Sequence, residues 1–147
     1  MIATAATPAP TTVADPVRAA ACVLPAAVEA VPSLRHFARA MARSWHLPDS
    51  TRETLTLIVT ELVTNVIRHS GSPDVALLLT SDAVTVTIQV RDRGQWRARS
   101  TGTALDACSG RGLHLVEAYA GCCSLRPTAV GTQVTAELFL PKPTLAR

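Results

Sequence analysis

Residues 50–69 read STRETLTLIVTELVTNVIRH, and this stretch does most to decide the fold. Its apolar residues recur at the spacing of one helix face, at Leu55, Ile58, Val59, Leu62, Val63 and Val66. Ser50, followed three residues later by Glu53, predicts a capping box at the helix start. The turn-forming run 69–73 (HSGSP) predicts its end near Arg68. We therefore expect an amphipathic helix that buries one face in a core.

The segments around this helix predict an α+β domain. In chain order we expect a strand at 21–24, helices at 32–45 and 50–68, strands at 75–80 and 84–90, a helix at 111–120, and strands at 122–126 and 133–140. The strand at 84–90 alternates apolar and polar residues, which is typical of a strand with one buried face. Hairpin-linked strands with a few helices predict a two-layer sandwich, in which helices pack on one face of a mixed, mainly antiparallel sheet.

Length and composition favour one globular domain. The chain has 147 residues, of which 48% are hydrophobic and 17% charged. Residues 1–20 are rich in Ala, Thr and Pro without periodicity and predict a flexible tail, followed by a domain over 21–141 and a short tail over 142–147. No apolar run approaches the ~20 residues of a membrane helix, and no signal peptide is recognisable. We expect a cytoplasmic protein that does not engage a membrane.

The basic residues restrict the kinds of nucleotide site that the chain can build. The formal net charge is only +3, which gives no reason to expect direct nucleic-acid binding. Lys142 is the only lysine, and it lies in the C-terminal tail. A P-loop requires Gly-Lys-Ser/Thr, and the usual protein kinases require a strand lysine, so both are excluded. Any nucleotide must therefore be held without lysine.

Two polar residues interrupt the apolar helix at 50–68. Glu61 and Asn65 are four residues apart, so they project from one side of the helix about one turn from each other. An ordinary solvated stripe is the alternative explanation, and the neighbouring Thr60 and Thr64 favour it.

Three short glycine-containing segments lie at the ends of the expected strands and helices, and a plain sandwich does not by itself require them. Asp92-Arg93-Gly94 directly follows the alternating strand, and Gly131-Thr132 opens the last strand. Ser109-Gly110-Arg111-Gly112-Leu113 opens the helix expected at 111–120, where free backbone N–H groups suit an anion such as phosphate. Taken singly, each segment is equally well explained as a loop start, a helix start or a hairpin turn.

Together, in this order, these segments resemble the motifs of a known family. The stretch ELVTNVIRH at 61–69 resembles the N box of the GHKL (Bergerat-type) ATP-binding superfamily. The segments at 92–94, 110–116 and 131–132 resemble its three glycine boxes. The likeness is closest to the small bacterial branch that contains the anti-sigma-factor serine kinases, and it covers about residues 21–140. It implies the Bergerat fold with ATP and Mg²⁺ as cofactors.

The resemblance assigns a role to each matching position. Asn65 would coordinate Mg²⁺, and Glu61 would be the general base for the attacking hydroxyl or water. Asp92 would accept a hydrogen bond from the adenine amino group, and Gly94 would let the backbone come close to the base. Thr132 would help to close the adenine pocket.

In the second glycine box, Gly110, Arg111 and Gly112 would cradle the phosphates, with Leu113 following in the same motif. The resemblance implies a serine/threonine kinase that phosphorylates a protein antagonist and sequesters a sigma factor. Because relatives often dimerise, it also implies a homodimer as one possible state. Trp96, where the first box often has a further glycine, favours the alternative of a non-catalytic, ATP-dependent protein-binding switch. A nucleotide-free structural domain is the third alternative.

Overall fold

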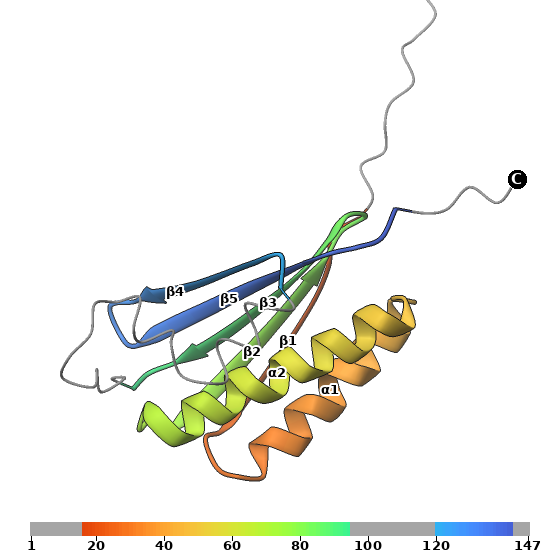
Figure 1. Ribbon diagram of the computed structural model, residues 1–147. Helices are drawn as coiled ribbons and strands as arrows, with labels where there is room; N and C mark the ends of the chain where they lie inside the picture. The colour runs from red at the N-terminus through yellow and green to blue at the C-terminus, as the bar shows by residue number, and fades with distance from the viewer. Residues whose placement is uncertain (1–15, 95–119, 143–147) are drawn as a thin grey trace, which may run out of the picture.

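The computed structural model describes residues 16–94 and 120–142, and the structural statements below concern these residues. Their elements are β1 (Arg18–Pro25), α1 (Ala30–Ser44), α2 (Asp49–His69), β2 (Asp74–Ser81), β3 (Thr85–Asp92), β4 (Cys122–Pro127) and β5 (Thr132–Phe139). The strands form one sheet in the order β1-β2-β3-β5-β4, and both helices cover one face of it (Figure 1). The expected α+β sandwich is confirmed. The sheet was expected to be mixed and mainly antiparallel, and all four pairings among the described strands are antiparallel.

The alternating strand pattern places one set of side chains between sheet and helices. Val86, Ile88 and Val90 of β3 are buried, while the residues between them are half-buried. Ile88 lies opposite Leu79 of β2 and Ala136 of β5, which are also buried, so the apolar row continues across the central strands. Side chains of successive strand residues point to opposite faces, so this row forms the floor of the core.

The helices supply the other half of the core. The α2 residues predicted to form its apolar face are all buried, at Leu55, Ile58, Val59, Leu62, Val63 and Val66. In α1, Leu34 and Ala38 are fully buried, and Phe37, Met41 and the C-cap residue Trp45 pack half-buried against the same core. No helix in the described part of the chain is both long and apolar enough to cross a membrane.

The capping box predicted for α2 is wrong. The helix begins at Asp49 with Pro48 as its N-cap residue, so Ser50 already lies inside it, and no side chain caps its N-terminus. Proline fixes φ near the helical value and suits a helix entry. The Arg52 guanidinium then holds the first turn, because its Nε donates to the Leu47 carbonyl over 2.8 Å and its Nη2 pairs with Asp49 over 2.6 Å.

Strand β1 begins earlier than the sequence indicated. Residues 18–20 pair with 79–81 of β2, so they belong to the sheet and not to a tail ending at residue 20. The backbone makes this pairing, and an alanine-rich stretch offers no alternation that reveals it. The helix predicted at 111–120 lies almost wholly outside the described residues, as do residues 1–15 of the predicted tail.

Candidate functional site

Two residues singled out in the sequence meet at one end of the sheet. Asp92, the last residue of β3, and Thr132, the first of β5, are direct partners in the β3–β5 register. Both are buried on the helix-covered face, with 4% and 8% of their surface exposed. The Cβ atoms of directly opposed strand residues lie about 4.5–5.5 Å apart, so the Asp92 carboxylate and the Thr132 hydroxyl are neighbours across the two strands. Carboxylates are rarely buried, and those that are buried are held by hydrogen bonds or ion pairs, which marks Asp92 as a specialised group.

The chain folds back directly after Asp92. The backbone N–H of Gly94 donates to Asp92 Oδ1 over 2.9 Å, the pattern of an Asx turn. This bond fixes one carboxylate oxygen relative to the chain that leaves β3.

Gly94 is required at its position by a backbone contact. A Cβ atom there would lie 1.9 Å from the Ser70 carbonyl oxygen and 2.9 Å from the Ser72 nitrogen. The chain after β3 therefore packs directly on the turn that follows α2. Gly94 was expected to let the backbone approach a base, and the structure supplies a different reason for the glycine.

Gly131 has an equivalent requirement on the other side of Asp92. A Cβ atom there would lie 2.0 Å from the Asp92 carbonyl oxygen and 2.7 Å from the Arg93 Cα. The backbone at the start of β5 therefore packs in close contact with the backbone at the end of β3. Glycines at 94 and 131 hold Asp92 between α2 and β5 by close backbone contact.

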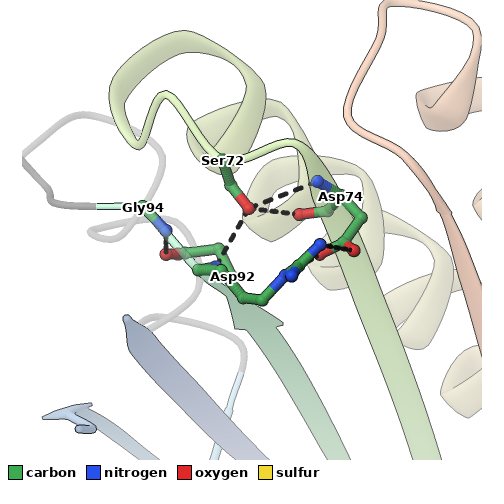
Figure 2. Close-up of polar contacts among 5 residues, drawn as sticks. Ser72, Asp74, Asp92 and Gly94 are labelled. Atoms are coloured by element: carbon green, nitrogen blue, oxygen red, sulfur yellow. Dashed lines mark hydrogen bonds and ion pairs between the residues drawn. The ribbon is translucent and has the colours of Figure 1, made fainter. Parts of the chain in front are cut away.

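Ser72, which sequence reasoning missed, ties these pieces together (Figure 2). Its Oγ accepts a hydrogen bond from the Arg93 backbone N–H over 2.9 Å and donates one to the Asp74 carbonyl over 2.5 Å. Its own backbone N–H donates to Ser70 Oγ over 3.1 Å. Ser72 is buried, so its hydroxyl bridges the turn after α2 and the residue that follows Asp92.

An ion pair continues this connection on the other side of the sheet. The Arg93 guanidinium makes two hydrogen bonds to the Asp74 carboxylate, over 3.1 Å and 2.5 Å. The Asp74 carboxylate raises the pKa of Arg93 above its ordinary value, first through hydrogen bonding and then through its charge. Because Arg93 is largely exposed, the pair contributes orientation more than stability.

Asn65 lies on the side of α2 that faces away from α1. Thr56 and Thr60 line a hollow together with arginines of α1, which identifies the side of α2 next to α1. At about 100° per residue, Asn65 lies half a turn around the helix from Thr56. Glu61 and Asn65 are both half-buried.

Asn65 lies at the same end of the molecule as Asp92. It precedes Ser70 by five residues, which corresponds to about 7.5 Å along the helix axis. Ser70 in turn is the residue on which Gly94 packs. The structure therefore brings Asn65, Asp92, Gly94 and Thr132 to one end of the sandwich, with Glu61 one helical turn further along α2. Gly110, Arg111, Gly112 and Leu113, also predicted for this site, lie outside the described residues.

The donor chemistry at this end suits a hard cation with few protein ligands. Within residues 16–94 and 120–142, no group of three or more His, Cys, Asp or Glu side chains could hold a metal ion. The Asn65 amide oxygen could serve as a ligand. Mg²⁺ commonly keeps several waters and takes further oxygens from substrate phosphates, so one such ligand fits this ion.

Comparison with known proteins places the chain in a family. Residues 24–138 match the family model described as histidine kinase-like ATPase domain, so the chain belongs to this family of ATPase domains. None of the curated proteins that were compared matched it.

Among solved structures, the fold is similar to the crystal structure of the RsbU and RsbW domains of Rv1364c from Mycobacterium tuberculosis. The TM-score is 0.64 at 22% identity, and the match covers 86% of this chain and 33% of the other. The chain thus spans about a third of the length of that protein. Family membership and fold together confirm the GHKL resemblance.

Proposed function

We propose that this protein binds ATP and Mg²⁺, transfers the γ-phosphate to a serine or threonine of a protein antagonist, and sequesters a sigma factor. The observation that carries the nucleotide part is the buried Asp92 carboxylate beside Thr132, at the sheet end that also receives Asn65. Membership of the ATPase domain family supports the choice of ATP. The RsbW domain named in the similar structure supports the choice of regulatory pathway.

Asp92 selects the base in this proposal. Its carboxylate accepts a hydrogen bond from the exocyclic amino group of adenine, and the Thr132 hydroxyl lies directly across the register to close the pocket. A hydrogen bond to a charged acceptor contributes about 1.5–3 kcal/mol. Guanine carries a carbonyl at the corresponding ring position, so the same carboxylate would repel it.

The α2 residues act on the phosphate end of the nucleotide. Asn65 holds Mg²⁺, which when bound neutralises phosphate charge. Glu61 accepts the proton of the attacking serine or threonine hydroxyl, and one helical turn separates the two side chains. Gly110, Arg111 and Gly112, with Leu113 in the same motif, cradle the phosphates. We place this activity in the cytoplasm and expect a homodimer.

The test is a phosphotransfer assay with labelled ATP and a candidate antagonist encoded near this protein. Label should appear on the antagonist with wild-type protein. Glu61→Gln should lower the rate about 10²–10⁴-fold while leaving ATP affinity unchanged. Glu29→Gln, which alters an exposed glutamate just before α1, is the matched control and should behave as wild type.

The same assay decides between the kinase and a non-catalytic ATP-dependent switch. Trp96 in the first glycine box is the sequence feature that favours the switch. ATP binding and ATP-dependent capture of the partner without any label transfer would establish the switch and reject phosphotransfer. Absence of ATP binding altogether would reject both.

A further inference from the structure

The face of the sheet that α1 and α2 leave uncovered has a hollow at the end where β3 stops. Its volume is about 510 Å³, and residues of β2, β3, β5 and the turn before β5 line it. Small-molecule sites commonly have volumes of about 300–1,000 Å³, so a small ligand fits. Asp92 borders the hollow, but its side chain is buried on the helix-covered face. The hollow therefore lies on the other side of the sheet from the proposed nucleotide site.

Arg91 lies between two strands that also contribute to the lining. In the sheet register it is opposite Ala76 of β2 on one side and Gln133 of β5 on the other. All three residues line the hollow. The Ala76 side chain ends at its Cβ atom, so it leaves room beside the longer Arg91 side chain.

The Arg91 guanidinium is held in place by the neighbouring strand. Its Nε donates to Gln133 Oε1 over 2.8 Å, and Gln133 Nε2 in turn donates to Thr135 Oγ1 over 3.3 Å. Arg91 Nη1 and Nη2 make no hydrogen bond or ion pair with the residues that the structure describes. The guanidinium therefore offers an oriented pair of donors, which matches the two oxygens of a carboxylate.

The second guanidinium of the hollow already has a counter-charge. Arg93 makes two hydrogen bonds to the Asp74 carboxylate, and both residues line the hollow. On the uncovered face, Arg91 is thus the one lining side chain whose charge has no counter-charge among the described residues. One uncompensated positive charge suits a ligand with a single negative charge.

An apolar surface and a further donor accompany this charge. Val130, in the turn between β4 and β5, lines the hollow with 69% of its surface exposed. Hydrocarbon packed against Val130 and Ala76 would remove apolar surface from water, which favours binding. Thr128 Oγ1 accepts a hydrogen bond from the Gly131 backbone N–H over 2.9 Å, so its hydroxyl proton can be donated to a ligand.

We propose that this hollow binds a short-chain aliphatic carboxylate. The carboxylate accepts two parallel hydrogen bonds from Arg91 Nη1 and Nη2, with the Thr128 hydroxyl as a third donor in the same lining. The hydrocarbon part covers Val130 and Ala76. A free organic acid and the C-terminus of a polypeptide that ends in an aliphatic residue offer the same chemical groups, and the experiment below distinguishes the two.

A carboxylate fits this hollow better than a phosphate or a nucleotide does. A phosphate monoester carries close to two negative charges at neutral pH, and the Asp74 carboxylate in the same lining would repel the second. The described residues of the lining include no aromatic side chain on which a base could stack.

This inference adds a second ligand site and does not depend on the proposed function. A failure of ATP binding would leave the carboxylate site standing, and a failure of carboxylate binding would leave the nucleotide site standing. Saturating Mg-ATP should not displace the carboxylate, because the two sites lie on opposite faces of the sheet.

The experiment titrates 15N-labelled protein with isovalerate at neutral pH and follows the amide resonances of Val130 and Gln133. These resonances should shift saturably, with a dissociation constant of about 0.1–10 mM for a ligand of this size. The uncharged isostere 3-methylbutan-1-ol should bind at least about tenfold more weakly. N-acetylleucine mimics a polypeptide C-terminus. Tighter binding of N-acetylleucine than of isovalerate identifies a chain terminus as the source, and the reverse order identifies a free acid.

Two variants localise the binding by different means. Arg91→Gln removes the charged pair of donors and should weaken isovalerate about ten- to a hundredfold. Ala76→Leu fills the space beside Arg91 without changing any charge and should weaken isovalerate to a similar extent. Arg39→Gln, which alters an exposed arginine of α1, is the matched control and should bind as wild type. Thermal unfolding verifies that each variant is folded.

Several results would overturn the proposal. They are the absence of saturable isovalerate binding, equal affinity for isovalerate and its alcohol, and wild-type affinity in the folded Arg91→Gln protein. Displacement of isovalerate by Mg-ATP would assign the binding to the nucleotide site. Tighter binding of inorganic phosphate than of isovalerate would reject a carboxylate as the ligand.

Discussion

Replacing Ser72 by alanine should destabilise the protein and loosen the part of the chain that carries Asp92. The Ser72 hydroxyl accepts a hydrogen bond of 2.9 Å from the Arg93 backbone N–H, which joins the turn after α2 to the residue after Asp92, and it donates one of 2.5 Å to the Asp74 carbonyl. No other acceptor for the Arg93 backbone N–H is found among the described residues. The substitution therefore leaves a part-buried donor without a partner.

The size of the effect follows from these bonds. An unsatisfied buried donor costs about 1–3 kcal/mol, and a neutral hydrogen bond contributes about 1 kcal/mol. Since part of the site remains open to water, we expect a loss of about 1–3 kcal/mol in the free energy of unfolding. For a chain of this length that lowers Tm by about 2–4 °C per kcal/mol.

Urea unfolding followed by circular dichroism measures the loss, with Ser124→Ala as the matched control. Ser124 is exposed on β4, so its replacement should change stability by less than about 0.5 kcal/mol. The folded Ser72→Ala protein should also distinguish ATP from GTP less well, because Asp92 is less firmly placed. Unchanged stability in Ser72→Ala would refute the role assigned to the hydroxyl.

Three further predictions concern single positions. Gly94→Ala forces a Cβ to within 1.9 Å of the Ser70 carbonyl oxygen, so the variant should lose about 2 kcal/mol or more in urea unfolding, and wild-type stability would contradict the packing. His46, two residues beyond the end of α1, has φ 55°, so His46→Gly should raise stability by about 0.5–1 kcal/mol, and a lower Tm would contradict the strain. The Asp82 carboxylate accepts two backbone N–H bonds, over 2.8 Å each, which lower its pKa in the folded state. Asp82 therefore stabilises the folded state at pH values above its unfolded pKa. This contribution disappears as the pH falls through the lower pKa of the folded state. Asp82→Asn should flatten the acid limb of the stability profile, and an unchanged limb would contradict this linkage.

The sequence predicted the core well because burial imposes a period. The alternation at 84–90 identified the β3 side chains that face the helices, and the helical spacing at 55–66 identified the buried side of α2. The sheet order was less accessible. The insertion of β5 between β3 and β4 depends on long-range backbone pairing, which leaves no local pattern.

The residues of the candidate site were likewise predicted only in part. Asp92 and Thr132 were predicted from short motifs, and the register places them opposite each other. Ser72 was missed because its partner, the Arg93 backbone, lies 21 residues further along the chain. In sequence it is only one of several small residues in a turn. Its role becomes visible when the end of β3 is seen packed on that turn.

The central claim is that ATP binds at the end of the sheet marked by Asp92, and calorimetric titration of Mg-ATP tests it most directly. Wild-type protein should bind ATP in preference to GTP. Asp92→Ala should bind ATP about ten- to a hundredfold more weakly, corresponding to the loss of one hydrogen bond to a charged acceptor. Asp82→Ala, at the opposite end of β2, should bind as wild type. No ATP binding by the wild type, or equal affinity in Asp92→Ala, would contradict the account.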